Sequence, residues 1–259
     1  MHRNTQRFIF AVTLLISCCL FASGSYADPP SRVGRMSYLQ GRVSFSPAGE
    51  NVWVNAQLNR PLVAGDRIWA NAHARAELQL GSAALRIEDE TSLRIINLND
   101  HIAQIDISQG TLQISVRQLN PGQIYEIDTP HLAFNITKAG DYRFDVDDNG
   151  NATTVTVRSG KGIAYAKNVA YKMKSGSAYR FTGRNLSHTQ YVAVRGLDSF
   201  DRWSSERERR ATKSRSIRYV STTVIGYEDL DTYGSWTYVR GYGNAWTPHH
   251  VPAGWAPYR

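Results

Sequence analysis

The sequence predicts an all-β protein, either a twisted β-solenoid or a jelly-roll-like sandwich, followed by one short basic helix and an irregular aromatic tail. Three observations favour this fold class. Short segments of alternating apolar and polar residues follow one another from Met36 onward, as half-buried strands require. Polar or glycine-containing turns separate them at fairly even intervals. No helical period lies between these segments until the composition changes near Gly196.

Residues 1–27 have the pattern of a secretory signal peptide. Arg3 and Arg7 precede an apolar run over residues 8–21, and Ala27 completes a small-x-small cleavage site. The run is shorter than the roughly 20 residues that span a membrane. We therefore expect a periplasmic or secreted mature chain without a transmembrane span. An alternative is lipoprotein processing at Cys18, where the sequence loosely resembles a lipoprotein cleavage box.

Composition restricts the chemistry of the mature chain. Both cysteines lie inside the predicted signal peptide, so disulfides, thiol catalysis and cysteine-zinc sites are excluded after cleavage. Removing Arg3 and Arg7 lowers the Lys plus Arg count from 30 to 28 against 22 acids, which leaves a net charge of +6. On a secreted protein, a positive charge favours binding to acidic envelope surfaces over binding to nucleic acid. The alternative is that the charge only keeps the protein soluble.

Strands are expected throughout residues 38–183, after a linker over residues 28–37. The clearest pair forms a hairpin, in which Tyr142, Phe144 and Val146 alternate with charged residues and Asn149-Gly150 supplies a tight turn before residues 154–158. The residues expected to face inward are large aliphatic ones: Leu78, Leu80, Leu85, Ile87, Leu93, Ile95, Ile105, Ile107, Leu112, Ile114, Ile124 and Ile127.

The order of these segments resembles the FecR-type envelope domain. The resemblance rests on Thr129-Pro130 after a strand, the 140–146 and 154–157 strands, a Gly-x-Gly turn at 160–162 and the later residues 174–177. The resemblance extends upstream to segments 62–68, 76–82, 85–87 and 110–112. The FecR-like region therefore covers roughly residues 38–183. Many members carry Gly-Thr before the Phe-x-Val strand, whereas residues 139–144 here resemble a secreted subgroup with a Trp- and Tyr-rich tail.

The resemblance implies a solenoid-like β domain. Family members that regulate sigma factors combine the domain with a transmembrane helix and a cytoplasmic anti-sigma segment. Here a predicted cleavable signal precedes the domain instead, so direct anti-sigma action is not expected. A sensory role through partner proteins stays open.

A basic helix is expected over residues 197–218, after a linker strand over residues 184–196. Asp198 is a suitable N-cap, and Leu197, Phe200 and Trp203 fall on one side of the helix. Two roles are open: a solvated linker helix whose aromatics pack on the β domain, or a helix lying on an anionic surface. The candidate contacts for such a surface are Arg207, Arg209, Arg210, Lys213 and Arg215.

The tail, residues 219–259, is dense in aromatic residues and turn formers. A Tyr-Gly-x-Trp pattern at residues 233–236 is echoed at residues 242–246, and the sequence stops directly after a further Trp-x-Pro unit, which leaves truncation of the tail open. Aromatic side chains stack on sugars or build a small core of their own. The candidate ligand-stacking residues are Tyr233, Trp236, Tyr242, Trp246 and Trp255.

Other motifs are incomplete. The pattern Asp145-x-Asp147-x-Asn149-Gly150 matches half of a calcium loop, but Thr156 stands where a bidentate Glu is needed. The adjacent His249 and His250 point to opposite sides of an extended chain and do not chelate together. We therefore expect no catalytic residue, cofactor or metal site.

The sequence favours a non-catalytic cell-envelope binding or scaffold protein, in envelope signalling, whose partner is an envelope protein or a cell-wall polymer. Two alternatives are kept. One is a carbohydrate- or peptidoglycan-binding protein that uses the aromatic tail. The other, less favoured, is an envelope hydrolase with convergent acids or a Ser-His pair in a cleft.

Overall fold

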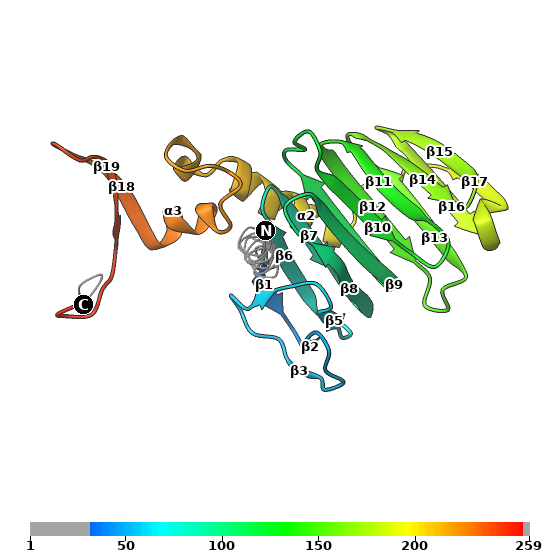
Figure 1. Ribbon diagram of the computed structural model, residues 1–259, viewed down its shortest axis with the longest axis horizontal. Coiled ribbons are helices and arrows are strands. Elements are labelled where there is room, and N and C mark those ends of the chain that lie inside the picture. The colour runs from blue at the N-terminus through cyan, green and yellow to red at the C-terminus, as the bar shows by residue number, and fades with distance from the viewer. Residues whose placement is uncertain (1–31, 256–259) are drawn as a thin grey trace, which may run out of the picture. The chain divides into compact units, whose positions relative to one another are not determined.

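The computed structural model describes residues 32–255 and confirms the all-β fold class (Figure 1). The predicted signal peptide with Cys18, and the tail beyond Trp255, lie outside the described residues. Two sheets carry the fold, and one strand runs through both.

Sheet A contains nine strands, all antiparallel to their neighbours. Their spatial order is β4 (Pro61–Leu62), β1 (Gly34–Gln40), β6 (Arg75–Leu80), β7 (Ala83–Ile87), β9 (Ile102–Val116), β12 (Gly140–Val146), β13 (Ala152–Val157), β16 (Ser177–Thr182) and β17 (His188–Val192).

Sheet B is built in the same way around the other half of β9. Its order is β3 (Val54–Asn55), β2 (Val43–Ser46), β5 (Arg67–Ala70), β8 (Thr91–Leu98), β9, β10 (Ile124–Asp128), β11 (Ala133–Lys138), β14 (Lys161–Ala166) and β15 (Val169–Lys174). Its pairings are antiparallel except for β10, which runs parallel to β9.

The shared strand β9 changes sheets at Gly110. Residues 102–109 pair in sheet B, and residues 110–116 pair with β7 and β12 in sheet A. Gly110 has a φ of +92°, and a Cβ there would lie 2.5 Å from the Cα of Thr91. Because neither the backbone angle nor the space admits a side chain, only glycine suits this position.

The core lies between the two sheets and is one continuous cluster of buried apolar side chains. The predicted inward residues are buried there with one exception: Ile124 is 39% exposed. Alternate residues of a strand face opposite sides, so Ile124 and Ile127, three positions apart, cannot both face inward. In β10 the core positions belong to Tyr125 and Ile127.

The predicted hairpin is confirmed. Strands β12 and β13 pair with Phe144 opposite Val155, and the Gly150 N–H donates to the Asp147 carbonyl at 2.7 Å in the turn. The same turn contains the half calcium motif. Its acids are already engaged, since Arg143 pairs with Asp145 at 2.9 Å and Arg180 with Asp147 at 2.7 Å.

The region after the β domain differs from the expectation of one helix over residues 197–218. After a short 3₁₀ turn η1 (Arg184–Leu186) and β17, helix α2 covers only Ser199–Thr212, and a separate 3₁₀ turn η2 (Arg215–Arg218) follows. Ser214 divides them because its backbone is extended, with ψ at 136°, and its side chain caps η2 by accepting from the Ser216 N–H.

The aromatic tail contains regular structure where an irregular segment was expected. Turn η3 (Tyr227–Asp229) and helix α3 (Leu230–Tyr233) lead into an antiparallel hairpin of β18 (Gly234–Val239) and β19 (Gly243–Pro248). The side chains of Arg35 and Asp229 form an ion pair at 2.5 Å, which connects η3 to β1.

Candidate functional site

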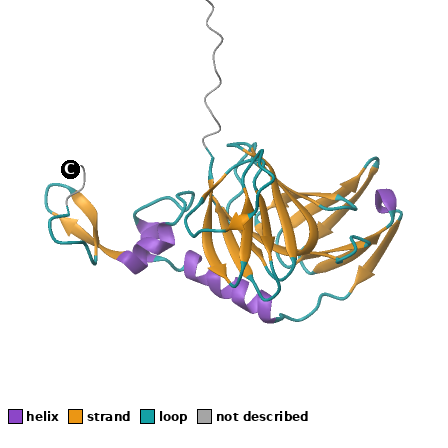
Figure 2. Ribbon diagram, turned by 90° about the horizontal axis from the view of Figure 1, so that it is seen from below, coloured by secondary structure: helices purple, strands orange, loops and turns teal. Residues whose placement is uncertain are grey.

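Helix α2 packs on the outer, polar face of sheet A (Figure 2). Its start is fixed by a reciprocal cap: Asp198 Oδ1 accepts from the Asp201 N–H at 2.8 Å, and Asp201 Oδ2 accepts from the Asp198 N–H at 3.1 Å. Such a capping box satisfies two backbone donors that the first turn leaves free. The buried side of the helix carries Phe200 and Ala211, but also Asp201 and Ser204.

Asp201 connects the start of α2 to strands β9 and β12 and to Arg158, which directly follows β13. Its carboxylate, 2% exposed, lies 2.6 Å from Arg158 Nη2 and 3.1 Å from Arg143 Nη1. It also accepts a hydrogen bond from the Gln113 side chain on β9. Arg143 additionally pairs with Asp198 at 2.6 Å. Two arginines thus compensate a carboxylate that burial would otherwise penalise heavily.

A second charged group joins the middle and end of α2 to the sheet. Arg86 on β7 is fully buried and lies 2.7 Å from Glu77 on β6 and 3.0 Å from Glu208 on the helix. Glu77 also accepts from Arg207 at 2.7 and 2.8 Å, and Glu208 accepts from Arg117 at 2.7 Å. Every ionised group in this cluster therefore faces an opposite charge.

The electrostatic balance around Glu77 is strongly one-sided. Burial alone would raise the pKa of Glu77, but the hydrogen bond from Arg207 and the charges of Arg86 and Arg207 outweigh it and lower the pKa to about 2. Glu77 is therefore an anion at every physiological pH, and it cannot serve as a proton donor there.

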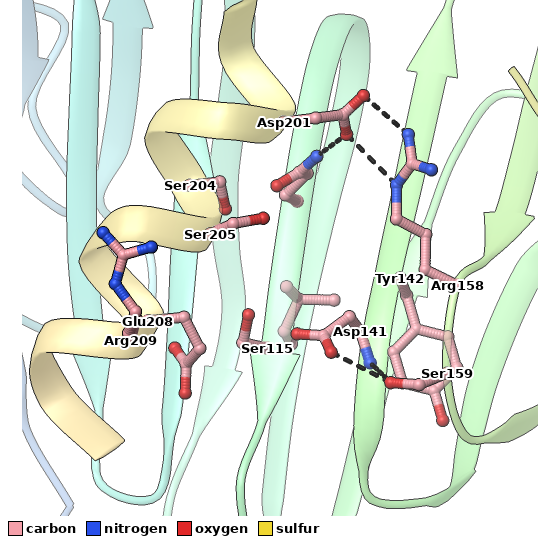
Figure 3. A pocket seen from close by; sticks show the side chains of 12 residues that line it. Ser115, Asp141, Tyr142, Arg158, Ser159, Asp201, Ser204, Ser205, Glu208 and Arg209 are labelled. Carbon is pink, nitrogen blue, oxygen red and sulfur yellow. Dashed lines mark hydrogen bonds and ion pairs between the residues drawn. The ribbon is translucent and has the colours of Figure 1, made fainter. Parts of the chain in front are cut away.

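A cavity of about 310 Å³ remains between α2, strands β9 and β12, and the turn that follows β13. Figure 3 shows its polar lining, with Ser115 and Asp141 on the strands and Ser204, Ser205 and Glu208 on the helix. The Ser159 hydroxyl donates to Asp141 at 2.9 Å, and Arg86 donates to Ser115 at 3.1 Å. No histidine is among the described residues that line the cavity, so its serines have no neighbouring imidazole base.

A neighbouring cleft of about 440 Å³ shares Arg158 and Asp201 with the cavity. Its lining balances four arginines against four aspartates: Arg143, Arg158, Arg180 and Arg195, with Asp145, Asp147, Asp198 and Asp201. All of these groups except Arg195 pair with one another, so the cleft offers no free carboxylate pair.

The predicted anionic-surface residues do not act as one group. Arg207 is held in its two hydrogen bonds to Glu77, and its guanidinium also lies 4.4 Å from the Tyr38 ring centroid. Its charge is therefore engaged within the protein. The remaining four, Arg209, Arg210, Lys213 and Arg215, are exposed, and Arg210 donates to Thr232 at 3.2 Å.

The predicted stacking residues fall into an anchored pair and an exposed set. Trp236 and Trp246 lie directly opposite each other in the hairpin and are half-buried. The Trp236 Nε1–H donates to Ser216 at 3.0 Å, and the Trp246 Nε1–H donates to the Leu230 carbonyl at 3.0 Å. The ring of Trp236 also stacks on Tyr219 at 4.5 Å.

The exposed set lies before, between and after the two strands of the hairpin. Tyr233 is 65%, Tyr242 89% and Trp255 53% exposed. Tyr238, 71% exposed, lies two residues after Trp236 and therefore on the same face of the hairpin. Trp236, Trp246 and Tyr238 thus lie on one face of the hairpin, where the two indoles are anchored by hydrogen bonds and the tyrosine is exposed.

Sequence reasoning missed the charged interface under α2, because its partners are distant in the chain. Arg207 and Glu77, for example, are 130 residues apart. It also missed that the polar positions of β6, β7 and β9 face a helix rather than solvent. The available signal was the presence of Glu77, Arg86 and Gln113 within otherwise apolar strands.

Residues 32–255 contain neither a cluster of metal ligands nor a helix that could span a membrane. Within that range no three His, Cys, Asp or Glu side chains are placed to hold a metal ion. None of the helices there is long and apolar enough to cross a membrane.

Comparison with known proteins gives a family for the central part of the chain. Two crystal structures of "a putative anti-sigma factor" from Parabacteroides distasonis, at 1.65 and 2.50 Å resolution, are similar to it, each with 12% identity and a TM-score of 0.42. The similarity covers 49% of this chain and 58% of that one. No curated protein matches the chain. The model of the FecR protein family matches residues 66–161, so this chain contains a FecR domain.

Proposed function

We propose that the protein is a non-catalytic binding or scaffold protein of the cell envelope, which acts in envelope signalling through a partner protein. The FecR domain provides the rigid body, and the aromatic hairpin β18–β19 provides the contact surface. The observation that carries the proposal is the exposure of Tyr238 and Tyr242, at 71% and 89%, on a hairpin whose indoles are anchored. Rigid, exposed aromatic side chains are typical centres of protein interfaces.

A non-catalytic role is supported by the state of the acids under α2. A carboxyl group that acts as a general acid or base needs a pKa near the working pH. Glu77 has a pKa of about 2, and Asp201 and Glu208 each face two arginines. These groups serve to hold α2 on the sheet.

Carbohydrate binding is the second candidate, favoured by one specific observation. Trp236, Tyr238 and Trp246 share a face of the hairpin, which is the arrangement that stacks on the apolar faces of sugar rings. The periplasmic or secreted location that the N-terminal pattern predicts would bring this face into contact with cell-wall glycan.

The test uses the full chain with Tyr238→Ala and Tyr242→Ala combined, and Tyr191→Ala as the matched control. Tyr191 lies on β17 and is 61% exposed, so the control removes another exposed tyrosine, away from the hairpin. Binding to purified peptidoglycan is measured by co-sedimentation, and binding to envelope proteins by chemical crosslinking in cells.

For a protein-binding role we expect a specific crosslink that the double variant loses and the control retains. Loss of peptidoglycan binding in the double variant, without any crosslink, would replace the signalling role by the carbohydrate role. Equal behaviour of both variants in both assays would exclude the hairpin as the working surface. Turnover of a glycan or ester by the purified protein would overturn the non-catalytic assignment.

A further inference from the structure

Lysine is distributed very unevenly in this chain. Only six of its 30 basic residues are lysines, and five of these, Lys138, Lys161, Lys167, Lys172 and Lys174, fall within residues 138–174. The sixth is Lys213. Where the described part of the chain forms buried or half-buried ion pairs, the cation is arginine. The two residue types are thus used for different purposes.

The strand register of sheet B aligns three of these lysines. Lys138 on β11 is opposite Lys161 on β14, and Lys161 is opposite Lys174 on β15. All three are exposed, and within residues 32–255 no carboxylate forms an ion pair with any of them. Like charges directly opposite each other on neighbouring strands destabilise a sheet. These three aligned lysines, the lysine row, therefore lower the stability of the sheet, so a role in folding does not account for their placement.

The backbone beneath the row is held in place from inside the protein. The Tyr142 hydroxyl on β12 accepts a hydrogen bond from the Lys161 N–H at 2.9 Å and donates to the Lys138 carbonyl. Tyr142 is 1% exposed, so this anchor is protected from solvent. The spacing between the first two lysines is consequently fixed by the core and does not depend on their flexible side chains.

The row ends at an open sheet edge. Strand β15 pairs with β14 and, among the described strands, with no other. The Ser175 N–H donates to the Gly160 carbonyl at 3.1 Å, so the alternation of an antiparallel ladder directs the N–H and C=O groups of Met173, Tyr171 and Val169 toward β14. Those of Lys172 and Ala170 therefore point away from the sheet.

The neighbouring backbone groups of Lys174 are already satisfied. Ser177 Oγ donates to the Lys174 carbonyl at 2.6 Å and accepts from its N–H at 3.3 Å. The open part of the edge is thus confined to Ala170 and Lys172. Lys172 lies two residues before Lys174, so its side chain projects on the same outer face as the lysine row.

We propose that this surface, made of Lys138, Lys161, Lys172, Lys174 and the open edge of β15, binds an extended acidic segment of a partner protein. The segment adds as a strand beside β15, its backbone pairs with Ala170 and Lys172, and its carboxylates lie on the lysine side. Strand addition explains the free backbone groups, and charge complementarity explains the lysines. A phosphate-bearing polymer or an anionic lipid surface would use the lysines alone. The proposal is independent of the aromatic hairpin.

The test measures binding of a short fluorescein-labelled peptide of alternating Glu and Val to the full chain by anisotropy. The matched probe is the same peptide with Gln in place of Glu. Competing probes are inorganic polyphosphate and vesicles of phosphatidylcholine and phosphatidylglycerol in equal parts. We expect the acidic peptide to bind to the unmodified chain. Its affinity for the triple variant Lys138→Gln, Lys161→Gln, Lys174→Gln should be about tenfold lower. Lys213→Gln, at the end of α2, is the control and should bind as the unmodified chain does.

Two further measurements separate strand addition from simple charge attraction. Hydrogen exchange of the Ala170 and Lys172 amides should slow when the peptide is bound. Lys172→Pro removes the outward N–H as well as the lysine charge, whereas Lys172→Gln removes only the charge, so the Pro variant should weaken binding more. The triple variant should unfold at the same temperature as the unmodified chain or higher, because it removes like-charge repulsion.

Three results would overturn the proposal. The first is absence of binding by the acidic peptide, and the second is equal binding by the triple variant and the unmodified chain. The third is binding without slowed exchange at Ala170 and Lys172 together with equal effects of the Pro and Gln variants. In that case tighter binding of polyphosphate or of the anionic vesicles would identify a charge-only surface.

Discussion

Arg86 on β7 lies directly opposite Glu77 on β6, and their charged atoms are 2.7 Å apart with side chains 0% and 3% exposed. The pair stands on the face of sheet A that α2 covers. Glu77 also binds Arg207 and Arg86 also binds Glu208, so this one cross-strand pair connects two strands with the helix at two points.

We expect Glu77→Gln to destabilise the protein by about 3–5 kcal/mol. The substitution preserves the shape of the side chain but leaves the buried Arg86 with one remaining carboxylate, and breaking a buried pair has a cost of this size. The measurement is the free energy of unfolding in urea. The control is Glu206→Gln, an exposed position on helix α2, which should change the free energy of unfolding by less than about 0.5 kcal/mol. Equal values for both variants would show that the pair is not a structural requirement.

Stability should fall with acid in a way that depends on Glu77. Its pKa is about 2 in the folded protein against 4.5 for an unperturbed Glu, so its contribution is complete above pH 4.5 and is lost as the pH falls toward 2. The loss amounts to as much as about 3 kcal/mol. Urea unfolding between pH 6 and pH 2 should therefore give a shallower pH dependence for Glu77→Gln than for the unmodified chain. Parallel curves would refute this assignment.

Gly110→Ala should be far more damaging than Gly122→Ala. Both glycines have positive φ, +92° and +81°, so both substitutions introduce backbone strain of a similar kind. The Gly122 position has nothing within 4 Å of the added methyl, whereas at Gly110 the methyl meets Thr91. We expect a further ~1–3 kcal/mol of destabilisation at Gly110. The thermal midpoints of the two variants check this difference.

Trp236→Phe should loosen the hairpin without unfolding the β domain. It removes the indole N–H that donates to Ser216 at 3.0 Å, at a cost of about 1 kcal/mol. Amide exchange should accelerate in β18 and β19 and stay unchanged in β12 and β13. Trp255→Phe is the control, because Trp255 is 53% exposed. Acceleration throughout the chain would contradict a locally anchored hairpin.

Local patterns predicted the strands but not all of their partners. The β12–β13 hairpin follows from alternation and an Asn-Gly turn, both of which are encoded within a few residues. The parallel pairing of β10 with β9, and the division of β9 between two sheets, depend on contacts that no local pattern contains. The apolar character of Ile124 alone does not show which face of β10 it occupies, and its position in the alternation places it outward.

The candidate site was predictable only in part, for a related reason. The hairpin indoles and the N-cap of α2 are local features, and the sequence indicated them. The helix sequence gives Arg207 the appearance of a free surface charge, because its partner Glu77 lies on β6, 130 residues away. The lysine cluster is visible in the sequence, but its alignment into a row appears only once the register of β11, β14 and β15 is known.

The passage of β9 through both sheets has a consequence for how the domain comes apart. Neither sheet has a complete set of strands of its own, because each takes half of the 15 residues of β9. If β9 detaches from one sheet, the strands that pair with it in the other sheet also lose their central partner. The two sheets should therefore melt in a single cooperative transition, with no stable intermediate in which one sheet survives alone.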